Sequence, residues 1–94
     1  MKDGEHIVYY ESGEIFYKYN YLVGEFHGEY ITYYKNGEIF SKSFYKDGKI
    51  HGKGVSYSRS GEISYKSYFI FGKIVSELKW LSYNRNIKLE LLGL

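Results

Sequence analysis

The chain has 94 residues, a formal net charge of +2, 13 Tyr and 11 Gly, but no Pro and no Cys. The weak charge argues against nucleic acid as a partner, and without cysteine neither a disulfide framework nor a thiolate zinc site can form. One domain of this length buries a modest core, and many Tyr and Gly without any Ala favour short strands joined by turns over helices.

From its N-terminus onward the chain repeats every 24 residues, and the tripeptide Gly-Glu-Ile begins at Gly13, Gly37 and Gly61. A fixed period of this size is typical of stacked supersecondary units. We therefore interpret residues 1–94 as a single repeat domain. It divides into three repeats and a degenerate C-terminal unit that we expect to act as a cap: residues 4–27, 28–51, 52–75 and 76–94.

Each repeat contains two runs of strand-forming residues around a turn, as in residues 29–45 around Asn36-Gly37. Asn-Gly is a strong hairpin signal because both residues tolerate positive φ, and Asp47-Gly48 predicts the next turn for the same reason. Applied to all four units, the pattern predicts an all-β fold. We expect an elongated antiparallel sheet of stacked β-hairpin repeats with about eight short strands in four hairpins.

Alternation along the strands assigns side chains to two faces of this sheet. On one face we expect an apolar core built from columns that repeat every 24 residues: Ile15/Ile39/Ile63/Ile87, Ile7/Ile31/Val55, Tyr9/Tyr33/Tyr57 and Phe26/Ile50/Ile74. Aromatic rings beside lysine stems on the other face are typical of protein-binding surfaces. The alternative is that a thin ribbon needs aromatic cover on both faces. The predicted partner-binding residues are Tyr10, Phe16, Lys18, Tyr34, Phe40, Lys42, Phe44, Lys66 and Tyr68.

Two stretches share a pattern of Tyr, a turn glycine and a His-Gly pair: residues 21–30 and 45–61. This pattern resembles the MORN repeat. The spacing Tyr-Tyr-x-x-Gly-Glu-Ile, which starts at Tyr9, is closer to the bacterial variant of that repeat, known from antitoxin-component proteins. The resemblance extends over residues 4–75. It implies a β-hairpin ribbon and a non-catalytic scaffold, and it does not identify a partner.

The polar residues that suggest chemistry follow the repeat. His27 and His51 occupy equivalent positions, and the third copy is Val75, so we interpret both histidines as structural and expect no metal site. Closely spaced glycines near Gly52 lack the following helix that a phosphate-binding loop requires. Recurring glutamates form ladders, whereas an active site is a singular arrangement. We therefore expect no enzymatic activity and no cofactor.

The function that fits best is a protein–protein interaction module of the antitoxin or immunity type, which neutralises a toxin by covering it. One alternative is a membrane-surface or phospholipid-binding module, although a net charge of +2 gives it little support. Another is a glycan- or cell-wall-binding repeat, which relies on repeated Trp, whereas Trp80 stands alone. The acidic start of the chain lacks a signal-peptide pattern, so we expect a cytoplasmic bacterial protein.

Self-association is a separate expectation. The first strand begins almost at the N-terminus, with no cap before it, whereas residues 76–94 are apolar enough to close the other end. Repeat arrays need capped ends for solubility, because an open end exposes hydrophobic surface and unpaired strand edges. We therefore predict a homo-oligomer, and a homodimer as its simplest form.

Overall fold

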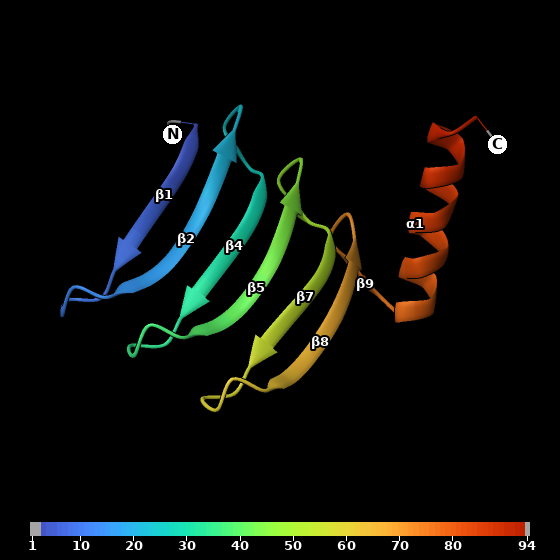
Figure 1. The fold of residues 1–94 in the computed structure, drawn as a ribbon. Helices are drawn as coiled ribbons and strands as arrows, with labels where there is room; N and C mark the ends of the chain where they lie inside the picture. The colour runs from blue at the N-terminus through green and yellow to red at the C-terminus, as the bar shows by residue number, and fades with distance from the viewer. Residues whose placement is uncertain (1–2, 94) are drawn as a thin grey trace.

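The computed structural model describes residues 3–93, which form one antiparallel sheet of nine strands followed by one helix (Figure 1). The elements are β1 (Gly4–Tyr9), β2 (Ile15–Leu22), β3 (Glu25–Phe26), β4 (Gly28–Tyr33), β5 (Ile39–Lys46), β6 (Lys49–Ile50), β7 (Gly52–Tyr57), β8 (Ile63–Ile70), β9 (Lys73–Val75) and α1 (Glu77–Leu91). The strand order is β1-β2-β4-β5-β7-β8-β9, with β3 paired to β2 and β6 paired to β5.

Three long hairpins carry the repeat, namely β1–β2, β4–β5 and β7–β8. Their first strands begin at Gly4, Gly28 and Gly52, at steps of 24 residues. Each hairpin pairs with the next through the middle of its strands, so the sheet grows by one hairpin per repeat. The predicted antiparallel sheet of stacked hairpins with a 24-residue period is confirmed.

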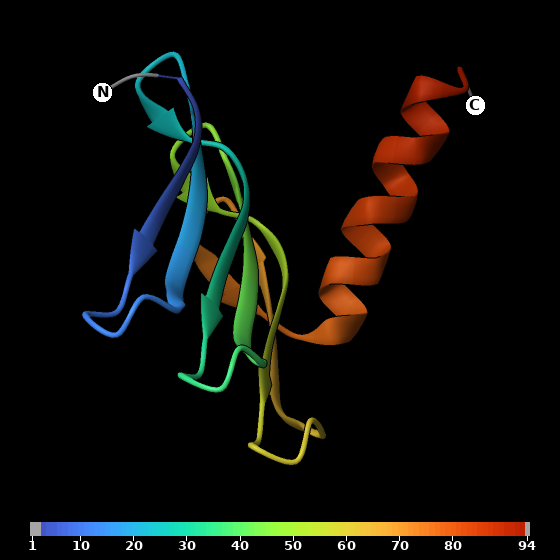
Figure 2. The ribbon, with the colours of Figure 1, turned by 60° about the vertical axis from the view of Figure 1, so that its left-hand side comes forward.

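The prediction of a fourth hairpin is wrong, because residues 77–91 form α1 instead. This unit lacks the glycines that turn the other units, and Ser76 caps the helix by accepting a hydrogen bond from the Lys79 amide at 3.2 Å. Trp80, Tyr83 and Ile87 are partly buried at a spacing of three and four residues, which is a helical period. Figures 1 and 2 show α1 projecting from the β9 end of the sheet and standing apart from β1–β5.

The two kinds of turn differ in backbone conformation. At Asp47-Gly48 both residues have positive φ, 51° and 78°, as predicted for a tight hairpin turn. The Gly48 amide donates to the Phe26 carbonyl at 3.1 Å, which joins this turn to the preceding repeat. At Asn36-Gly37 only the glycine has positive φ, at 90°, so the predicted conformation of Asn36 is wrong.

A β-bulge near the turn of each long hairpin shifts the register by one residue. Val8 pairs with Tyr17 and Tyr9 pairs with Ile15, which leaves Phe16 without a partner across the strand. Without the bulge, Ile7 would pair with Tyr17 and share its face of the sheet. With the bulge, Ile7 pairs with Lys18 and lies on the opposite face. The same shift moves the Ile7/Ile31/Val55 column to the face of the lysines, so its predicted place in an apolar core is wrong.

The sheet is a single layer, and no hydrophobic side chain within residues 3–93 is fully buried. The expected core columns are half-exposed or exposed, and Ile63 is 49% exposed. The molecule measures 52 × 34 × 21 Å. It exposes 6769 Å², whereas a compact monomer of 11.1 kDa exposes about 5,650 Å². Both faces of the sheet are therefore accessible.

Candidate functional site

One face of the sheet carries a continuous cross-strand row in which aliphatic and lysine side chains alternate. In strand order the row consists of Ile7, Lys18, Ile31, Lys42, Val55 and Lys66, each paired with the next. We call the side that bears this row the lysine face. Lysine stems lie well against aliphatic neighbours while their ammonium groups reach water. The register therefore unites the three predicted lysines.

The first lysine of the row is held by its neighbours. The Lys18 Nζ lies 5.6 Å from the centre of the Tyr33 ring. Its hydrogen bond to Tyr33 raises the pKa of Lys18, and the nearby carboxylates of Glu5 and Glu29 act in the same direction. At this end of the lysine face the positive charge is thus balanced by acidic groups.

The other end of the lysine face carries three lysines, Lys42, Lys53 and Lys66, with Glu29 opposite Phe44 as the nearest strand carboxylate. Phe44 and Tyr68 lie on it, two residues along their strands from Lys42 and Lys66, and Tyr68 pairs with Lys53. The Tyr68 hydroxyl donates to the Glu77 carboxylate at the start of α1, and this bond raises the pKa of Tyr68. We call the five residues Lys42, Phe44, Lys53, Lys66 and Tyr68 the basic patch.

Lys53 was not among the residues predicted from the sequence. In strand β7 Lys53 lies two residues before Val55 and so shares its face. The unbulged register assigns that face to the core. The bulge between Ser56 and Tyr57 brings Lys53 opposite Tyr68 instead. A bulge signal near the turn, with two residues facing one across the hairpin, would have revealed it.

The remaining predicted residues lie at the turn edge of the sheet as two Tyr–Phe pairs. The rings of Tyr10 and Phe16 are 4.5 Å apart, and those of Tyr34 and Phe40 are 5.0 Å apart. Phe16 and Phe40 both occupy bulge positions. Each pair belongs to its own repeat and flanks the turn of its hairpin.

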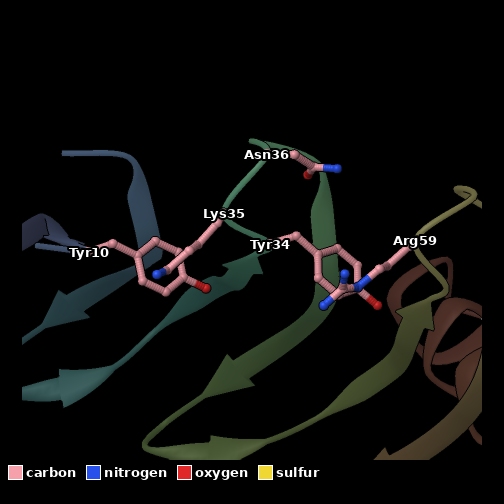
Figure 3. A pocket seen from close by; sticks show the side chains of 5 residues that line it. All are labelled: Tyr10, Tyr34, Lys35, Asn36 and Arg59. Carbon is pink, nitrogen blue, oxygen red and sulfur yellow. The ribbon is translucent and has the colours of Figure 1, made fainter. Parts of the chain in front are cut away.

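The two tyrosines of this edge also join neighbouring repeats. The Tyr10 hydroxyl donates to the Tyr33 carbonyl and the Tyr34 hydroxyl to the Tyr57 carbonyl, both at 2.7 Å. Figure 3 shows the Lys35 side chain over the Tyr10 ring and the Arg59 side chain over the Tyr34 ring. With Asn36 these residues line an open pocket of about 410 Å³.

The opposite side of the sheet, the tyrosine face, divides into a ridge and a hollow. The ridge is a cluster of rings with centres 5.0–5.9 Å apart: His6, Tyr17, Tyr19, Tyr21, Phe26, Tyr30 and Tyr45. Burial among these rings raises the pKa of Tyr30. The hollow, of about 220 Å³, lies over the small residues Ser41, Ser43, Gly54, Ser56 and Ser67.

His51 serves the scaffold at the junction with the helix. Its Nδ1 accepts a hydrogen bond from the Phe71 amide at 3.0 Å, and its ring lies 5.2 Å from Trp80 and 5.8 Å from Tyr83. Burial, together with the charge of Lys46, lowers the pKa of His51. His27, at the equivalent position, is exposed.

Within residues 3–93 there is neither a metal-binding cluster nor a membrane-spanning helix. No group of three or more His, Asp or Glu side chains could hold a metal ion there. No helix in that part of the chain has the length and apolar character needed to cross a membrane.

The model of the MORN repeat variant matches residues 2–22 and 26–47. These segments contain the first two long hairpins, and the third hairpin continues their period outside the matched segments. No curated protein and no solved structure matches the chain.

Proposed function

We propose that this chain, which carries MORN repeats of the variant type, binds an acidic surface of a partner protein through its basic patch. MORN repeats are non-catalytic binding modules. The proposed role is of the antitoxin or immunity kind, in which the module neutralises a toxin by covering it. The partner then supplies the cover that a single-layer sheet lacks.

The observation that supports this proposal most is the row of alternating aliphatic and lysine side chains on a sheet without a buried core. A surface with apolar area between positive charges can gain affinity from both, since burial of the apolar part accompanies electrostatic attraction. The exposed rings add anchors, because Phe44 is 42% exposed and lies beside the row.

The distribution of charge favours an acidic partner. Around Lys18 the carboxylates of Glu5 and Glu29 reduce the net positive potential. In the basic patch Lys42, Lys53 and Lys66 pair with aliphatic or aromatic residues. Two carboxylates adjoin the patch, Glu29 opposite Phe44 and Glu77 bonded to Tyr68, so its three lysines still leave an excess of positive charge. An acidic patch steers a partner to such a surface and speeds its association.

The test begins with capture of partners from the native lysate on immobilised wild-type protein, followed by affinity measurements with the purified partner. The variant Lys42→Glu/Lys66→Glu reverses two charges of the basic patch and should raise the dissociation constant at least about tenfold. The matched control Lys79→Glu/Arg85→Glu makes the same change in net charge on exposed positions of α1. It should bind as wild type does.

Equal affinity of both variants, with circular dichroism showing intact folds, would remove the basic patch from consideration. Flotation with anionic phospholipid vesicles at low salt distinguishes the membrane alternative. Binding to vesicles that Lys42→Glu/Lys66→Glu abolishes, with no protein partner retained, would replace the proposed function with lipid binding.

A further inference from the structure

The ridge and the hollow of the tyrosine face arise because the side chains at one cross-strand pair of the repeat become smaller from the first hairpin to the third. Three equivalent cross-strand pairs occupy consecutive hairpins: His6 with Tyr19, Tyr30 with Ser43, and Gly54 with Ser67. Along the chain these pairs hold two rings, then one ring, then none. The backbone repeats while the side chains shrink, so a raised half and a recessed half lie next to each other on the same face.

We propose that the tyrosine face binds a second copy of this chain, with the ridge of each copy seated in the hollow of the other. A two-fold axis parallel to the strands, between β4 and β5, places β2 of one copy over β7 of its partner. Such an interface is self-complementary, as two-fold interfaces must be, because each residue contact occurs twice. On this axis Tyr30 of one copy meets Ser43 of the other.

The exposed area agrees with this arrangement. The chain exposes roughly 1,100 Å² more than a compact monomer of its mass, while a standard interface takes about 800 Å² from each partner. Face-to-face packing of two sheets would give the molecule the two-layer core that it does not form alone. No residue of α1 lines the hollow.

The chemistry of the two halves also matches. Buried tyrosine rings need a partner for their hydroxyl groups. Ser41, Ser43, Ser56 and Ser67 line the hollow and offer hydroxyl groups that both donate and accept. Its wall contains apolar side chains, including Phe69 and Ile50, which suit the ring edges. Of the basic patch only Lys42 also lines the hollow, and the proposal does not depend on the function proposed above.

The repeat itself supplies test variants that the scaffold should tolerate. Ser43→Tyr introduces the side chain that Tyr19 has one repeat earlier, and it fills the hollow. Tyr19→Ser makes the reverse exchange and lowers the ridge. Sedimentation equilibrium over a dilution series should give twice 11.1 kDa for wild type. Each variant should raise the dimer dissociation constant at least about tenfold.

The matched control is Lys53→Glu/Lys66→Glu, at two lysines of the lysine face that do not line the hollow, which should dimerise as wild type does. A wild-type protein that stays at 11.1 kDa at every concentration would overturn the proposal. Dimers of unchanged strength in Ser43→Tyr, with the fold intact by circular dichroism, would also overturn it, because a filled hollow cannot accept the ridge.

A second measurement tests the geometry without relying on affinity. The chain has no cysteine, so Tyr30→Cys and Ser43→Cys each carry a single thiol. When the two variants are mixed and oxidised by air, a disulfide should form mainly between unlike chains. Predominant cross-linking between like chains would exclude the proposed axis.

Discussion

The first and third hairpins have the same strand lengths, the same register and the same bulge, yet they do different things. The first carries rings at His6 and Tyr19, where the third carries Gly54 and Ser67. The third meets α1 and holds most of the basic patch, whereas the first holds much of the ridge. The comparison teaches that the period fixes the backbone, while the departures from the period assign a task to each hairpin.

The largest loss of stability is expected from a substitution that breaks the contact between the third hairpin and the helix. The Trp80 ring packs against His51. It also lies 3.9 Å from the position that a Cβ atom would take at Gly52. Trp80→Ala should lower the free energy of unfolding by about 2 kcal/mol, because a half-buried ring loses its contacts. Urea unfolding followed by circular dichroism measures it. The control Leu78→Ala, at a side chain 79% exposed, should change little; equal losses in both would refute the role of Trp80.

A smaller effect sharpens the contrast at the turn edge. Tyr34→Phe removes the hydroxyl that donates to the Tyr57 carbonyl and should cost about 1 kcal/mol of unfolding free energy. Thermal and urea unfolding both report it. Tyr9→Phe, at a ring that is 57% exposed, is the matched control. If the two variants lose the same stability, the bond does not join the second hairpin to the third.

The smallest expected effect is a pH dependence at the helix junction. The pKa of His51 is lowered from 6.5 by burial and by Lys46, so the unfolded chain takes up the proton first. Stability is therefore complete above the unfolded pKa and falls as the pH drops through 6.5 towards the folded value. His51→Asn keeps an acceptor for the Phe71 amide without titrating in this range.

Urea unfolding followed by Trp80 fluorescence, at about pH 7.5 and about pH 5.5 on either side of the ordinary histidine pKa, checks this prediction. Wild type should lose more stability than His51→Asn between the two conditions. An identical loss in both proteins would assign the pH dependence to other groups.

The sequence alone predicts the sheet, its period and the tight turn at Asp47-Gly48, because these depend on local chemistry. It does not predict that Asn36 keeps negative φ before Gly37. It does not predict the shared face of Ile7 and Lys18, since one bulged residue reverses a face assignment made from alternation. The helix was also missed: Ser76 reads as a substituted turn glycine, although it is equally a good helix cap.

For the candidate site, the sequence brings together the three lysines and the two Tyr–Phe pairs. It does not reveal that Tyr10 and Tyr34 bond to the next repeat, because such a bond depends on where the following strand lies. Nor does it show the hollow beside the ridge. That feature depends on three hairpins lying side by side, which places Ser43 and Gly54 on one surface.

The tyrosine hydroxyl groups that donate to the following repeat affect how such a ribbon could gain or lose repeats. Tyr10 and Tyr34 each donate to the hairpin that follows, and the next equivalent position, where no further long hairpin follows, is Ser58. Residues 28–51 both receive such a bond and provide one, so an in-frame duplication of this segment would be compatible with itself at both junctions. A copy of residues 52–75 inserted after itself would lack the donor. Growth by gene duplication is thus favoured in the interior of the array, and the serine marks where it stops.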